Sequence, residues 1–227
     1  MPAYEEPPVL PGGSFFVKEN VEMCLFKQAA KAWLDLIGTE YEIVTGRRGK
    51  QYTIKLDFEA ADFPHLAGMQ YARDADFNLN PDEYYGEKLI PALIDGKLDG
   101  TGIERSRNWS RIEGRLKAII NLQKTLDSKF AIALFDQDNV KYTNSSIDAD
   151  YVIKNLDSGE TYFVFIDEDK NQRQYCKSAF KQEKIDFMDG QQKLTLLKNT
   201  KRVDGMDNVL FLHPNFTPAE TKEPATV

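Results

Sequence analysis

The sequence predicts one α+β domain over residues 20–200, in which an N-terminal helix and a long helical insertion pack on an antiparallel sheet. Three patterns indicate this class: helical apolar spacing near the N-terminus, the same spacing over residues 105–126, and short strand-like runs in the second half. Residues 1–19 are expected to form an irregular arm, because prolines and glycines are frequent there. Residues 201–227 are expected to form a loosely held C-terminal tail.

Apolar residues recur at helical spacing in four segments. The first is favoured by Asn20 as a cap and by Gly38 after its last apolar residue. The second follows Asp62-Phe63-Pro64, which is typical of a helix start because Asp caps and Pro is tolerated in the first turn. Helices are expected over residues 20–37, 65–73, 83–93 and 105–126.

The strand-like segments lie in two groups. Residues 52–58 alternate apolar and polar side chains, so one face of this strand is expected to be buried. Glycines at both ends of residues 46–50 predict a hairpin before it, and the link 167–171 predicts a second hairpin. Strands are expected over residues 41–45, 52–58, 130–135, 151–155, 161–166, 173–178 and 193–198.

The composition is that of a chain that buries a core. Of the 227 residues, 41% are hydrophobic and 11% aromatic, which excludes disorder over the whole length. The single core is expected to contain Trp33, Phe58, Trp109, Leu116, Phe135 and Phe165. Two separate cores, or parallel strands joined by crossovers, would contradict this arrangement.

Several classes of protein are excluded by what the sequence lacks. No apolar run approaches the roughly 18 residues that cross a bilayer, and no signal peptide is visible at the N-terminus. Cys24 and Cys176 are the only cysteines and lie far apart, which excludes a disulfide scaffold and a zinc ribbon. The sequence therefore predicts a soluble cytoplasmic protein that has no membrane partner.

The charge is unevenly distributed along this acidic chain of net charge −7. Residues 105–124 hold six basic side chains against one acidic, and residues 170–202 hold nine against three. Each basic segment has two interpretations: it contacts phosphate, or it is a solvated face balanced by acidic neighbours in the fold. A globally acidic chain does not favour a protein that coats nucleic acid.

Familiar catalytic signatures are absent, including Gly-rich phosphate loops, the HExxH motif and the GxSxG motif. His65 and His213 are the only histidines, so neither a metal site nor a cofactor is expected. His65 stands in the first turn of a predicted helix, where the helix dipole favours the neutral imidazole that a general base needs. The alternative is that His65 packs under the sheet and donates one hydrogen bond to the backbone.

A family resemblance rests on the order of several segments. They are 52–58 (YTIKLDF), 63–69 (FPHLAGM), 94–98 (IDGKL), 103–116 (IERSRNWSRIEGRL), 178–180 (SAF) and 193–197 (KLTLL). This order resembles the phage-associated nuclease domains named for barnase, EndoU, colicin E5/D and RelE, the BECR group. It is most similar to the fourth phage-BECR class, PBECR4, over about residues 20–200. The resemblance implies a BECR-like fold, an origin in phages or mobile elements, and toxin-like, metal-independent ribonuclease activity.

Cleavage of RNA without a metal needs a base for the 2′-OH, an acid for the departing 5′-oxygen, and cationic groups at the phosphate. His65 is the candidate base or acid, and Arg107, Arg111 and Arg115 recur at the four-residue spacing of one helix face. That stripe is alternatively a solvated face or a set of ion pairs. Catalytic roles are assigned to His65, Arg111 and Ser178, where Ser178 matches the family pattern and has packing as its alternative role. Substrate binding is assigned to Arg47, Arg48, Lys50, Arg107, Arg115 and Lys193.

Two functions from different classes agree with these observations. The first is a ribonuclease that cleaves RNA by 2′-OH transesterification. The second is a non-catalytic accessory protein of the same fold that binds protein or nucleic acid. The partners expected are RNA and an inhibitor or phage protein. His65, the arginine stripe and the loop 47–50 are expected to line one concave surface.

Overall fold

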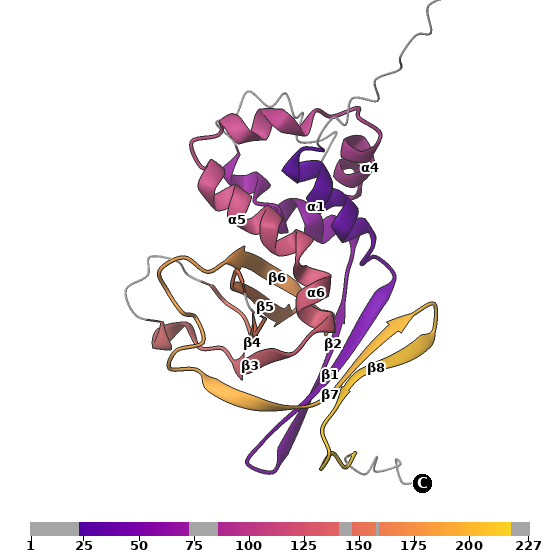
Figure 1. Ribbon diagram of the computed structural model, residues 1–227, viewed down its shortest axis with the longest axis vertical. Coiled ribbons are helices and arrows are strands. Elements are labelled where there is room, and N and C mark those ends of the chain that lie inside the picture. The colour runs from indigo at the N-terminus through magenta and orange to yellow at the C-terminus, as the bar shows by residue number, and fades with distance from the viewer. Residues whose placement is uncertain (1–22, 73–85, 141–146, 158, 219–227) are drawn as a thin grey trace, which may run out of the picture.

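The computed structural model describes residues 23–72, 86–140, 147–157 and 159–218. Figure 1 shows short helices grouped over one end of a strongly curved sheet. The strands are β1 (Thr39–Arg47), β2 (Lys50–Asp57), β3 (Phe130–Leu134), β4 (Tyr151–Asn155), β5 (Tyr162–Glu168), β6 (Gln174–Lys181), β7 (Gln192–Val203) and β8 (Met206–Leu212). The α-helices are α1 (Leu25–Leu34), α2 (Phe63–Leu66), α4 (Leu89–Ile94), α5 (Trp109–Ile120) and α6 (Leu122–Asp127). Single 3₁₀ segments are η1 (Ala60–Asp62), η2 (Met69–Tyr71), η3 (Gly86–Lys88), η4 (Gly100–Arg105) and η5 (Gln137–Asn139).

Seven strands close into a barrel in the order β1-β2-β6-β5-β4-β3-β7, and β7 returns to pair with β1. The expected antiparallel sheet is therefore wrong. β2 and β6 pair in parallel, Leu56 with Gln174 and Asp57 with Tyr175, so the barrel is mixed. Closure depends on pairing between β1 and β7, which are far apart in the chain, and local periodicity carries no information about such pairs.

The expected long helical insertion over residues 105–126 is wrong as well. The chain there forms the end of η4, then α5 and α6, and α5 ends at Ile120, before Asn121, where φ is −97° and ψ is 1°. The Asn121 side chain donates a hydrogen bond back to the Lys117 carbonyl at 2.8 Å, which satisfies an acceptor at the end of α5. The apolar spacing continues across this break, and for that reason the sequence resembles one helix.

Strands β4 to β6 are buried on both faces, and this produces two hydrophobic clusters instead of the one predicted. Ile153 and Val164 belong to the cluster that all seven barrel strands share with the helices. Val152 and Phe165, on the opposite face, belong to a second cluster, which Phe187 from the β6–β7 connection covers. A strand buried on both faces loses the apolar–polar alternation that marks a one-sided sheet.

Five of the six side chains expected in the core are buried. The five are Trp33, Phe58, Leu116, Phe135 and Phe165. Trp109, at the start of α5, is only half-buried and packs against the edge of the first cluster. The sequence thus predicted which individual side chains are buried, but not that they form two clusters.

The hairpins at the two ends of the chain are longer than expected. β1 and β2 are joined by Arg48 and Gly49, both at positive φ, so the five-residue link shrinks to a two-residue turn. The Asp167–Asn171 link does join the antiparallel pair β5 and β6, as predicted. Residues 206–212, expected within the loose tail, instead form β8 and pair with β7 outside the ring.

Candidate active site

His65 lies on a single helical turn between β2 and α4. A helix was expected over residues 65–73, of which residue 73 lies outside the described residues; residues 65–72 do not form one helix, because Gly68 adopts φ 82° and separates α2 from η2. Phe63 and Leu66 point into the core, while His65 is exposed on the opposite side of the same turn. The short turn therefore holds the imidazole at the surface with two buried anchors beneath it.

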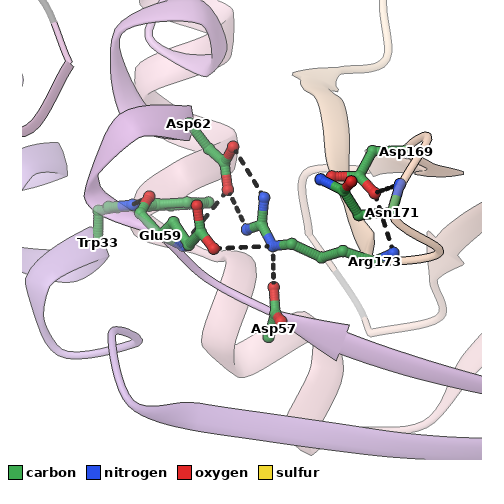
Figure 2. Close-up of polar contacts among 7 residues, drawn as sticks. All are labelled: Trp33, Asp57, Glu59, Asp62, Asp169, Asn171 and Arg173. Atoms are coloured by element: carbon green, nitrogen blue, oxygen red, sulfur yellow. Dashed lines mark hydrogen bonds and ion pairs between the residues drawn. The ribbon is translucent and has the colours of Figure 1, made fainter.

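Arg173 fastens this turn to the barrel (Figure 2). Its guanidinium bonds Asp62 at 2.5 Å and Asp57 at 2.6 Å, and Glu59 lies 3.3 Å away. The Arg173 side chain is only 17% exposed, so these ion pairs are shielded from water more than ordinary surface pairs. Arg173 stands just before β6 and thereby joins the parallel β2–β6 pairing to the segment that carries His65.

Gly68 allows Arg115 of α5 to lie across the end of α2. A Cβ atom at Gly68 would stand 3.0 Å from the Arg115 Cδ atom and 3.4 Å from the Tyr71 ring. A side chain at this position would therefore displace the arginine. Gly68 thus determines how closely the Arg115 guanidinium approaches the turn that carries His65.

Arg111 and Arg115 both lie against the ring of Tyr71. The Cζ atoms are 4.9 Å and 5.3 Å from the ring centroid, and Arg115 is also 5.9 Å from the ring of Phe180. The Arg115 Nη1 donates to the hydroxyl of Ser178 at 3.2 Å. Stacking and one fixed hydrogen bond therefore hold the two guanidinium groups side by side.

A β-bulge in β6 directs Lys177 toward the same place. Phe165 pairs with Ser178 and Ile166 pairs with Cys176, which leaves Lys177 as the extra residue. Its ammonium bonds Asp167 at 2.5 Å and lies 3.8 Å from Asp148. Bulges of this kind re-aim one side chain of a strand, and they are frequent beside active sites.

The neutral form of His65 is favoured by its surroundings. Partial burial, then the positive charges of Arg115 and Lys177, lower the pKa of His65, and Asp62 opposes them. The expected direction is therefore correct and the expected cause is not, because a helix of one turn has only a small dipole. The lowered pKa favours the unprotonated imidazole, which is able to accept a proton.

Arg115 differs from exposed cations such as Arg48 and Lys50 in being partly buried. In the described ranges, neither Arg111 nor Arg115 is paired with a carboxylate. The cations that are paired include Lys117, Lys154, Arg173, Lys177, Lys181, Lys198, Lys201 and Arg202. Burial lowers the pKa of Arg115, yet a guanidinium stays protonated at neutral pH. A desolvated cation without a counter-ion is a binding site for an anion.

A cavity of about 290 Å³ opens beside the arginine pair. Tyr71, Arg111 and Arg115 line one side of it, and Phe180 and Phe187 line the other. Gly114 of α5 also lines the cavity, and a Cβ there would lie 3.9 Å from Lys181 of β6. The absence of a side chain at Gly114 keeps this space open between helix and strand.

The structure does not bring the predicted cations of the β1–β2 hairpin and of β7 to this site. Lys50 begins β2, whereas His65 follows its far end, so the hairpin loop and the histidine turn lie at opposite ends of a strand that spans about 23 Å at about 3.3 Å per residue. Arg47 hydrogen-bonds Gln192 and Lys193 is the next residue of β7, so these cations gather at the far end with Arg48. Arg107 precedes α5 and therefore does not extend the helical stripe.

Three residues of the site were missed in the sequence. Tyr71 gave no signal because its role depends on contacts from another helix. Lys177 lies within a predicted strand, and nothing in the sequence marks the bulge. Phe180 belongs to residues 178–180, one of the segments on which the family resemblance rests, and this was the only sequence signal for the cavity wall.

The family model PBECR4, described as phage-Barnase-EndoU-ColicinE5/D-RelE like nuclease4, matches residues 25–209. No curated protein and no solved structure matches the chain at a significant level. Within the residues that the structure describes, no three His, Cys, Asp or Glu side chains cluster closely enough to hold a metal ion. No helix of this described part combines the length and apolar character that crossing a membrane requires.

Proposed function

Because the chain belongs to the phage BECR-like nuclease 4 family, we propose that it is an endoribonuclease that cleaves RNA without a metal ion. One observation supports this most. Two guanidiniums that lack carboxylate partners lie on the same ring, and the charge of one of them, Arg115, acts on a histidine whose pKa is lowered. The guanidiniums supply a site for a phosphodiester anion, and the imidazole supplies a base.

The proposed reaction is a transesterification at one phosphodiester. His65 accepts the proton of the 2′-OH, the 2′-oxygen forms a bond to phosphorus, and the bond from phosphorus to the 5′-oxygen breaks. Arg111 and Arg115 stabilise the charge that grows on the non-bridging oxygens, and Ser178 holds Arg115 in place. The products end in a 2′,3′-cyclic phosphate and a 5′-hydroxyl.

The departing 5′-oxygen needs a proton, and we assign this role to the hydroxyl of Tyr71. Tyr71 hydrogen-bonds Arg115 and its ring lies against both arginines, so its hydroxyl stands where the phosphate would bind. Tyr71→Phe should keep the stacking and lower kcat by about 10²–10⁴-fold. A substrate with a better leaving group should recover most of this loss, and an unchanged kcat would refute the assignment.

The proposal is tested with labelled single-stranded RNA in excess EDTA. The wild-type protein should give fragments that end in 2′,3′-cyclic phosphate, and His65→Ala should lower the rate by at least about a hundredfold. His213→Ala is the matched control, because His213 is the only other histidine and follows β8. Equal rates for the wild-type protein and His65→Ala would refute the role of His65.

The alternative function, a non-catalytic binding protein, is favoured by the net charge of −7. Such a charge repels RNA at long range and weakens its capture. RNA that stays intact at every protein concentration, while a partner protein binds at the arginine pair, is the result that this alternative predicts.

A further inference from the structure

We propose that the cavity beside the arginine pair holds one unstacked nucleobase, so that the substrate is single-stranded RNA. This inference rests on the proposed function, because it places the base next to the phosphate that Arg111 and Arg115 would bind. The cavity of about 290 Å³ lies near the lower end of the range for ligand pockets, and so suits a single base with its sugar.

The chemistry of the walls fits a flat aromatic ligand. Phe180 and Phe187 line the cavity and pack edge to face at 5.3 Å between ring centroids, and the Arg115 Cζ atom lies 5.9 Å from the Phe180 ring centroid. Unpaired bases in RNA complexes stack on aromatic side chains and on arginine planes in this way. Ser110 and Glu183, which also line the cavity, supply polar groups that can meet the edge of a base.

The cavity and the arginine pair share one wall, so a base and its own phosphate would reach both at once. Tyr71 and Arg115 line the cavity, and they also form the stack that holds the guanidiniums. A base inside a duplex is stacked and paired, and its extraction costs free energy that a single strand does not require. Duplex RNA is therefore expected to bind only through its phosphates.

The test measures binding, which does not depend on turnover. The probes are a 2′-O-methyl trinucleotide, which has no 2′-OH to react, and an abasic backbone of the same length. The wild-type protein should prefer the trinucleotide by roughly 5- to 150-fold, the range expected for stacking one base. Ser110→Leu fills the mouth of the cavity from an exposed position and should bind both probes equally, whereas Ser110→Ala should keep the preference.

Phe180→Leu provides a second variant, which removes an aromatic face, and its thermal unfolding shows whether the fold is retained. A folded Phe180→Leu protein should lose most of the preference for bases. Equal binding of both probes by the wild-type protein, or an unchanged preference in Ser110→Leu, would overturn the inference. A protein that prefers the trinucleotide but never cleaves RNA would support the base site and refute the proposed function. A protein that cleaves RNA without this preference would support the proposed function and refute the base site.

Discussion

His65 owes its neutral imidazole to its neighbours in space and not to its place in a helix. The histidine is exposed on a one-turn helix, and the charges that act on it come from α5 and from the bulge in β6. Because its pKa in the folded protein lies below the ordinary value of about 6.5, the unfolded chain binds this proton more tightly. The free energy of unfolding should therefore fall as the pH drops below about 6.5.

Removal of one of these charges should change the pKa of His65 in a known direction. Lys177→Met removes a positive charge that lowers it, so the pKa should rise and the acid limb of kcat/KM should move to higher pH. The ring-proton NMR signal of His65 measures this directly. Lys117→Met, which breaks an exposed pair with Glu113, is the control and should leave the signal unchanged. A pKa that falls in Lys177→Met would contradict the electrostatic account.

At the scale of elements, the turn 63–71 is fixed in two places, by Gly68 against α5 and by Arg173 against the barrel. The sequence predicted a helix start at residues 62–64 and the helical spacing of α5. It did not predict that these two segments are in contact. Their meeting depends on β2 and β6 pairing in parallel, which brings the start of β6 beside the end of β2. Pairing of this kind leaves no local pattern in either strand.

Gly68→Ala should disturb the site more than it disturbs the fold. The left-handed backbone costs alanine about 1 kcal/mol, and the new Cβ lies 3.0 Å from the Arg115 Cδ atom, so the guanidinium must move. The shift needed is a few tenths of an ångström, so activity should fall by less than the roughly hundredfold loss that a 1 Å displacement causes. Gly96→Ala is the matched control, because its φ of 72° imposes similar strain with nothing within 4 Å of the Cβ. Equal activities in the two variants would show that Gly68 does not position Arg115.

Arg173→Met should loosen the histidine turn. It leaves Asp57, Glu59 and Asp62 close together without their cation, and we expect the free energy of unfolding to fall by about 2–3 kcal/mol. The estimate is below that for a fully buried pair, because Asp57 and Glu59 are partly exposed. Arg202→Met, which breaks exposed pairs, should lower the free energy of unfolding much less. Urea unfolding compares them, and similar losses would contradict a special role for Arg173.

At the scale of the whole molecule, the sequence predicted most strands and buried side chains but not the architecture. Strand existence follows from local composition, whereas closure of the barrel depends on β1 meeting β7 and on a parallel contact between β2 and β6. The same long-range pairing divides the predicted cations into two groups. Arg111 and Arg115 join His65, and Arg47, Arg48, Lys50 and Lys193 gather around the other end of β2, a strand about 23 Å long at about 3.3 Å per residue.

The most direct test of the proposed function uses a DNA oligonucleotide that contains a single ribonucleotide, incubated in EDTA. The account predicts one cut, on the 3′ side of the ribonucleotide, with a 2′,3′-cyclic phosphate identified by mass spectrometry. His65→Ala should slow this cut at least about a hundredfold, and His213→Ala should not change it. Cutting at deoxyribonucleotides, or cutting that requires an added metal ion, would contradict the account.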